Sequence, residues 1–430
     1  MLKSENKIGL WSAVGIGVGA MMGAGIFALM GQAGAIAGKA VYISFILGGI
    51  VALISGYSLA KLGARFPKAG GIVEYVAQAF GVNVFSGGIS VLLYVSSIIA
   101  LALLAKAFGS YAAVLFNLKG SLIYTNVFAL SIMAILGVIQ YFGVKKVVKF
   151  QNVAIIITIV ILVVFATVGL IYLKPGLMAP ALYPSSNKIF FSIAITFFSY
   201  EGFRIITHTA EDIVNPEKNL MKAIFISIGI AMVIYTALAY AVFGNLEVDK
   251  VIEAKNYALA EASKPVFGAI GFTIISITAL FSTSSSINAV LYAATNISYQ
   301  MAEDGEFPGF FAKQFGYSRE GLLISLVLTG LVIVFLDLLQ IAAVGSITVL
   351  FIHAVTHLGH LKIIRQTKAS KLLVVTALLT TLTVIVLFLI YSIKDSYTIL
   401  FLFGGILALS FLIELTIRLI INRKVTKSNP

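Results

Sequence analysis

Glycines concentrate in the first long apolar segment of the chain, between positions 15 and 25. Five of these eleven residues are glycine, and each weakens a helix by about 1 kcal/mol relative to alanine. One interpretation is a close crossing of two helices, which small residues permit. The other is a broken helix whose backbone N–H groups at Gly23, Ala24 and Gly25 face an anionic group such as a carboxylate.

A second unusual segment is Phe198-Ser-Tyr200-Glu201-Gly202-Phe-Arg204, which lies inside another apolar stretch. A glutamate and an arginine at mid-depth in a membrane are costly, so they must face protein, water or each other. The i, i+3 spacing of Glu201 and Arg204 allows a pair that only neutralises itself. Alternatively, the segment is a second helix break that lines a cavity.

The elements that must position these residues are transmembrane helices. The chain has 430 residues, of which 60% are hydrophobic and 11% charged, with a mean hydropathy of +1.04. This composition excludes a soluble enzyme, a nucleic-acid-binding domain and a single-span receptor. Long apolar runs also exclude an outer-membrane barrel, and the absence of cysteine excludes disulfides and thiolate metal sites.

We predict an all-α integral membrane protein with twelve spans and one polytopic domain over residues 1–430, its first span retained in the mature chain. With the N-terminus inside, inner segments hold 20 Lys and Arg residues and outer segments 8. This bias predicts that both termini are cytoplasmic. The spans are expected near 9–36, 40–62, 84–116, 124–143, 150–173, 189–212, 221–244, 265–300, 321–338, 341–361, 371–393 and 397–421.

The two interruptions fall in the first and sixth spans. Glycine-broken segments at corresponding positions indicate two repeats with a transport site between them at the bilayer midplane. We therefore predict a five-helix inverted repeat, with 1–173 as the first unit, 189–361 as the second, and two extra helices over 371–421.

Motifs along spans 1–8 resemble those of the amino acid–polyamine–organocation (APC) transporters, which have the LeuT-type fold. The likeness is greatest to an archaeal proton-coupled permease. The motifs are Gly23-Ala-Gly-Ile-Phe27, Phe66-Pro-Lys-Ala-Gly-Gly71, Ser199-Tyr-Glu-Gly-Phe203, Ala210-Glu-Asp-Ile-Val-Asn-Pro216 and Met301-Ala-Glu-Asp-Gly-Glu-Phe-Pro308.

The resemblance implies a secondary transporter of amino acids in the cell membrane that works by alternating access, and not an enzyme. Backbone N–H groups at Gly23, Ala24 and Gly25 would hold the substrate carboxylate. Carbonyl groups of Met21, Phe198 and Glu201 would hold its amine, and the Phe198 ring would close over it. A polyamine or organic-cation carrier and an amino-acid exchanger are the alternatives.

The resemblance also implies where a coupling ion would bind. Proton-coupled relatives have a span 5 lysine at the position of Thr158, and threonine cannot carry a proton charge. Gly19 and Ser282 would be its neighbours, and their oxygens would suit a sodium ion. The coupling ion is therefore either H⁺ or Na⁺, with Glu201 as another proton candidate, or exchange is independent of ions. We expect no other cofactor and no metal site.

The remaining polar residues of the spans bear on specificity. A cation at Arg204 would repel a cationic substrate, unless Glu201 neutralises it; Tyr200 and Lys106 are further gating candidates. Three histidines in span 10 are expected at a polar cytoplasmic helix end, with a role in pH sensing as the alternative: His353, His357 and His360. The expected partners are an amino acid and lipid, without nucleic acid, and the sequence leaves the oligomeric state open.

Overall fold

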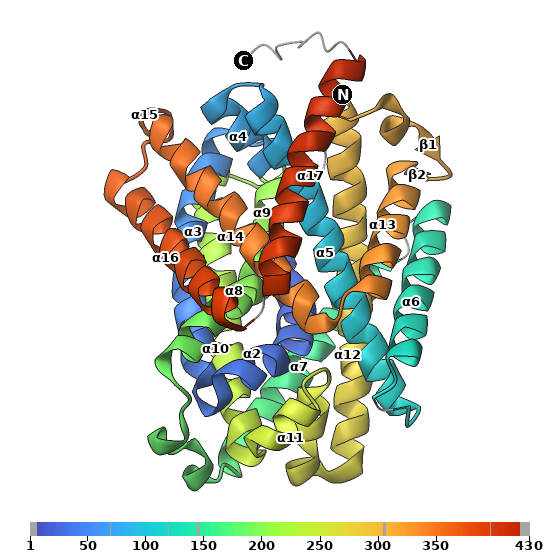
Figure 1. Cartoon of the computed structure of the whole chain (residues 1–430), viewed down its shortest axis with the longest axis vertical. Coiled ribbons are helices and arrows are strands. Elements are labelled where there is room, and N and C mark those ends of the chain that lie inside the picture. The colour runs from blue at the N-terminus through green and yellow to red at the C-terminus, as the bar shows by residue number, and fades with distance from the viewer. Residues whose placement is uncertain are drawn as a thin grey trace.

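The computed structural model describes residues 7–68, 70–118, 120–143, 147–303, 307–395 and 397–421. Nearly all of them are helical (Figure 1). The first half contains α1 (Leu10–Met21), η1 (Met22–Ile26), α2 (Phe27–Ala37), η2 (Gly38–Ala40), α3 (Val41–Arg65), α4 (Ile72–Phe80), α5 (Val84–Leu115), α6 (Leu122–Phe142) and α7 (Val147–Ile171).

The second half begins after two short turns, η3 (Pro175–Met178) and η4 (Pro180–Leu182). It contains α8 (Ser186–Tyr200), η5 (Glu201–Phe203), α9 (Arg204–His208), α10 (Pro216–Asn245), α11 (Val248–Glu253), α12 (Ala258–Glu303), η6 (Gly309–Ala312), α13 (Gly321–Phe335), α14 (Leu338–Lys362), α15 (Ile364–Thr367), α16 (Lys371–Asp395) and α17 (Tyr397–Ile421). A small hairpin pairs β1 (Gln314–Phe315) with β2 (Ser318–Arg319).

The span count agrees with the prediction. Among the described residues, nine apolar helices are long enough to cross a membrane, and three shorter ones complete the set. The mainly apolar stretch Phe27–Arg65 turns at Gly38, where φ is +51°. Glycine adopts this left-handed conformation readily, so the chain can end the first span and begin the second there. The expected unit boundaries at 173 and 361 fall at helix ends, while the repeat relation itself stays a prediction.

Both interruptions occur where glycine predicted them, but neither is an unwound segment. In the first span, the five residues of η1 form a π-helical turn between α1 and α2. In the sixth, η5 is a single 3₁₀ turn between α8 and α9. The backbone keeps right-handed helical angles on both sides of each turn. π turns and 3₁₀ turns inside helices often mark functional positions.

Burial separates the central helices from those at the edge of the bundle. In α5, 89% of the apolar window is buried, and in α14 83%, whereas in α17 only 17% is buried. A helix that is apolar on all sides belongs inside the bundle if it is buried and against lipid if it is exposed. The chain begins and α17 ends at the same end of the molecule, together with α4 and α15 (Figure 1).

Candidate functional site

The two interrupted helices touch each other at Gly202. A Cβ atom on Gly202 would lie 2.6 Å from the backbone nitrogen of Met21 and 2.7 Å from the carbonyl carbon of Ala20. Real Cβ atoms do not approach that closely, so only glycine permits this packing. The sequence predicted a break at this position, and the structure adds that the break brings η5 against the end of α1.

A tyrosine of α10 joins the same two segments. The Tyr235 hydroxyl group lies 2.5 Å from the carbonyl oxygen of Met21 and 3.3 Å from that of Ser199, and it donates to these acceptors. Gly25 packs directly against this hydroxyl group and against the Ser199 carbonyl. Sequence reasoning missed Tyr235, because an isolated tyrosine in an apolar helix carries no local signal.

The three coupling-ion candidates lie around the first span. Gly23 packs against Ser286 and against the backbone oxygen of Ser282 on α12. Gly19 packs against Ile155 of α7, one helical turn before the buried Thr158. Gly19 thus lies against α7 and Gly23 against α12, so the first span contacts both helices that hold the other two candidates.

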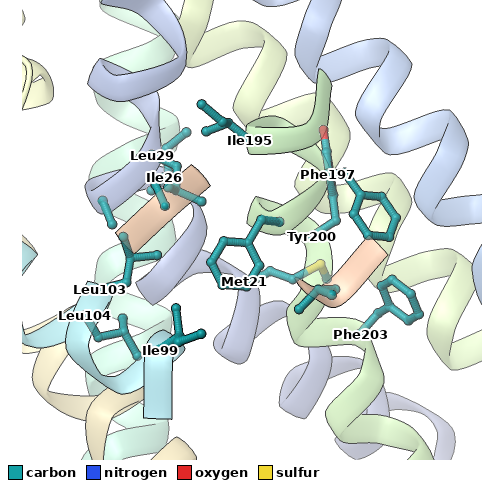
Figure 2. Packing of buried hydrophobic residues seen from close by; sticks show 14 of the residues in the cluster. Met21, Ile26, Leu29, Ile99, Leu103, Leu104, Ile195, Phe197, Tyr200 and Phe203 are labelled. Carbon is teal, nitrogen blue, oxygen red and sulfur yellow. The ribbon is translucent and has the colours of Figure 1, made fainter. Parts of the chain in front are cut away.

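The aromatic candidates face in different directions. The Phe198 ring lies against Gly345 of α14, and Ile99 of α5 lies beside the same glycine. Phe198 therefore faces the two most buried helices of the bundle. Tyr200 instead points toward α3, where its hydroxyl group donates to the Phe45 carbonyl at 2.8 Å. Figure 2 shows buried apolar side chains near both interruptions, among them Ile26, Ile99 and Leu103 near the first and Phe197 and Phe203 near the second.

Glu201 and Arg204 form a buried charge cluster with a residue of α14. Arg204 Nε lies 2.6 Å from Glu201 Oε1, and His353 Nε2 lies 3.1 Å from Glu201 Oε2. Both contacts are close, but their angles fall outside the limits for a hydrogen bond. Since Glu201 neutralises Arg204, this arginine does not repel a cationic substrate, and it gives no reason to exclude one.

The three histidines of α14 are buried, and they pack against polar side chains of α3. Their exposed fractions are 0% for His353, 0% for His357 and 1% for His360. They contact Ser55 and Ser58 of α3 through hydrogen bonds of 2.6–2.9 Å. The two serines are three residues apart and so share one helix face, a weak signal that the sequence analysis did not use.

Lys106 lies apart from this cluster. Lys106, on α5, is 4% exposed. The carboxylate of Asp337, which precedes α14, attracts its ammonium group electrostatically. Asp337 caps that helix by accepting a hydrogen bond from the Gln340 backbone at 2.8 Å. Lys106 therefore belongs to the end of the bundle at which α14 begins.

The N-terminal segment closes over the end of the sixth span. The Ile8 backbone donates to the Asp212 carbonyl at 2.8 Å and accepts from Val214 at 3.0 Å, which forms a parallel bridge. The pKa of the adjacent Glu211 is raised, because desolvation and the carboxylate of Asp212 both disfavour its charged form. We call this pairing of Ile8 with residues 212–214 the N-terminal latch.

In the described part of the chain, no three His, Asp or Glu side chains are grouped so that they could hold a metal ion. The polar groups at the interruptions include backbone carbonyls, hydroxyl groups, the Glu201 carboxylate, the Arg204 guanidinium group and the His353 imidazole.

Comparison with known proteins settles the family. Residues 8–429 match the family model described as amino acid permease. The chain belongs to this family. The match confirms the APC membership that the motifs predicted.

Individual relatives agree with this assignment. An uncharacterized protein of Methanocaldococcus jannaschii is 38% identical to the permease over 98% of this chain and 97% of its own. The inner membrane transport protein YbaT of Escherichia coli is 33% identical over 97% of both chains. The serine/threonine exchanger SteT of Bacillus subtilis is 27% identical over 71% of this chain and 70% of its own.

Proposed function

We propose that the permease is a secondary amino-acid transporter of the cell membrane that works by alternating access. The observation that carries the proposal is the contact of the two interrupted helices at Gly202 and Met21. Interrupted helices that meet inside a bundle provide N–H groups for an anion and carbonyl groups for a cation at one place. An amino acid carries both charges on neighbouring atoms.

Backbone groups recognise the part of the substrate that all amino acids share. N–H groups of Gly23, Ala24 and Gly25 bind the carboxylate, and carbonyl oxygens of Met21, Phe198 and Glu201 bind the ammonium group. The Met21 carbonyl has two lone pairs, so its hydrogen bond from Tyr235 leaves one for the substrate.

The substrate side chain is proposed to be uncharged. Apolar side chains lie beside the interruptions, among them Ile26, Ile99 and Leu103, and the carboxylate of Glu201 already pairs with Arg204. A charged side chain would lose its hydration without gaining an opposite charge. This environment favours a neutral amino acid over a polyamine or another organic cation.

Both termini are proposed to face the cytoplasm. The excess of Lys and Arg supports this orientation, which places α4, α15 and the N-terminal latch on the cytoplasmic side. The latch then closes the inner end of the path, and α1 and α10 must separate there when the inner side opens.

Uptake into proteoliposomes tests the function. Proteoliposomes that contain the purified permease are loaded with an unlabelled amino acid or with putrescine. The same compound is then added outside in radiolabelled form, and its entry is measured. We expect saturable counterflow of neutral amino acids, which Gly25→Leu abolishes because a side chain there overlaps Tyr235. Gly15→Leu is the matched control, since Gly15 faces open space in the same span. Counterflow of putrescine alone would contradict the proposal, as would the absence of any counterflow.

A further inference from the structure

A row of hydrogen-bonded side chains runs between α14 and α3, from His353, which contacts Glu201, to a cavity at the end of the bundle. It alternates imidazole rings of α14 with hydroxyl groups, two of them on α3 and the last on α15. We call it the histidine file, and its members are His353, Ser55, His357, Ser58, His360 and Thr367.

The half of the file nearest the site begins at the carboxylate. Glu201 Oε2 lies 3.1 Å from His353 Nε2, and His353 Nδ1 lies 2.6 Å from Ser55 Oγ. The same hydroxyl group lies 2.9 Å from His357 Nε2. Ser55 therefore bridges two imidazole rings.

The other half repeats this pattern. Ser58 Oγ lies 2.9 Å from His357 Nδ1 and 2.8 Å from His360 Nδ1, so it bridges the next two rings. His360 Nε2 then lies 2.8 Å from Thr367 Oγ1. His357 and His360 thus have both ring nitrogens in hydrogen bonds of the file, while His353 has Nδ1 in a hydrogen bond and Nε2 in contact with Glu201.

We propose that the histidine file conducts protons between Glu201 and this end of the bundle, and that it couples amino-acid transport to a proton gradient. The inference rests on the proposed function. Every member of the file can both accept and donate a proton. A buried network that served packing alone would need satisfied groups, but it would not need an unbroken path from a carboxylate to a cavity.

One transfer leaves the file without net charge. In the starting state, each ring is neutral and donates toward Glu201, and each hydroxyl group donates to the ring on its Glu201 side. A proton binds to Thr367 Oγ1, and the hydroxyl proton of Thr367 moves to His360 Nε2. Each following ring or hydroxyl group then gives its own proton to the next member of the file. At the end, His353 Nε2 gives its proton to Glu201 Oε2. Every N–H or O–H bond that breaks is replaced by one on the opposite side of the same group. Reorientation of the hydroxyl groups and of the imidazole rings, with no further bond broken, then resets the file.

The far end of the file reaches a cavity. Thr367 lines a cavity of about 510 Å³. The charged residues that line the same cavity are Lys61, Arg65, Glu217, Lys218 and Lys368. Lys61 also acts electrostatically on His360. These ammonium groups disfavour a resident cation in the file, so protons pass through it without being stored. In the proposed orientation, the cavity faces the cytoplasm.

The near end explains how proton arrival could act on the transport site. Glu201 belongs to η5, the turn that packs on the first span through Gly202. Protonation of Glu201 removes the negative charge that pairs with Arg204, so the balance of charge changes at the contact of the two interrupted helices. Phe197 and Phe203 place ring edges near His353, with centroids 5.4 and 5.9 Å away, which keeps this end dry.

An isosteric pair of substitutions at Ser58 tests the inference. Valine and threonine have nearly the same shape, but Ser58→Val breaks the file and Ser58→Thr keeps a hydroxyl group. Proteoliposomes are assayed for amino-acid counterflow without gradients, and for substrate-dependent proton flux with a pH-sensitive dye on the inside. We expect Ser58→Val to lose at least 10-fold in proton flux while counterflow stays within 2-fold of wild type. Ser58→Thr should retain both activities.

A second break and a control make the result independent of one site. His357→Phe interrupts the file at its centre, while His208→Phe changes the chain's fourth histidine, which lies outside it against Gly71. Only His357→Phe should lose proton flux. Normal flux in both file-breaking variants, or wild-type uptake that follows an imposed sodium gradient and not a proton gradient, would overturn the inference. Wild type without counterflow would instead refute the proposed function.

Discussion

The Tyr235 hydroxyl group donates a hydrogen bond to the carbonyl oxygen of Met21, with a separation of 2.5 Å. The same hydroxyl group contacts the Ser199 carbonyl. One side chain of α10 thus holds the end of α1 and the end of α8 at a fixed distance. The proposed amine site lies between these two helix ends.

Tyr235→Phe should weaken both stability and substrate binding. The change removes one oxygen atom and leaves the Met21 carbonyl buried without this partner, which costs about 1–3 kcal/mol. We expect a lower melting temperature in detergent and a KM for uptake raised roughly 10-fold, by the equivalence of 1.4 kcal/mol with a factor of ten. Tyr240→Phe on the same helix is the control, and an unchanged KM in Tyr235→Phe would refute the role given to this hydroxyl group.

Gly202→Ala should abolish transport while the same change at Gly229 has little effect. An added Cβ atom at Gly202 meets the backbone of Met21 at 2.6 Å, and backbone cannot move aside as a side chain can. Gly229, on α10, has open space around it. Initial rates of counterflow measure both variants, and wild-type rates in Gly202→Ala would show that the contact of the interrupted helices is not required.

Glu201→Gln should destabilise the fold more than the double change Glu201→Gln with Arg204→Met. The single change leaves the Arg204 guanidinium group buried without its carboxylate, and breaking a buried pair in this way costs about 3–5 kcal/mol. The double change also removes the Arg204 guanidinium group, so no buried cation is left without a partner and the loss of stability is smaller. Melting temperatures in detergent decide the point, and a double variant less stable than the single one would contradict the pairing.

Ile8→Pro should open the inner end of the permease. Proline has no N–H group, so the hydrogen bond from Ile8 to the Asp212 carbonyl is lost and the N-terminal latch weakens. The chain contains no cysteine, so a thiol introduced at the buried Ser227 reports access without background.

The readout is the rate at which a membrane-impermeant maleimide modifies Ser227→Cys from the cytoplasmic side. We expect a rate several-fold higher in the Ile8→Pro background. Equal rates in the two backgrounds would mean that the latch does not close this path.

Several features of the architecture follow from the sequence because they depend on local composition. Apolar length sets the number of spans, since each must cross the same hydrocarbon thickness. Glycine marks both interruptions, because it weakens a helix wherever it occurs. The type of interruption did not follow: η1 is a π turn and η5 a 3₁₀ turn, and packing against Tyr235 and Met21 decides that geometry.

The histidine file is the clearest case of what only tertiary structure decides. The sequence places His353 and His357 on one face of a helix, because they are four residues apart. Their partner Ser55 is about 300 residues away along the chain, at separations of 298 and 302 positions. No periodicity within a single span reveals which two helices pack together, because side chains from the whole bundle determine that contact. The sequence by itself therefore determined where the polar residues lie along each helix, and the packing of α3 against α14 decided that they form one connected path.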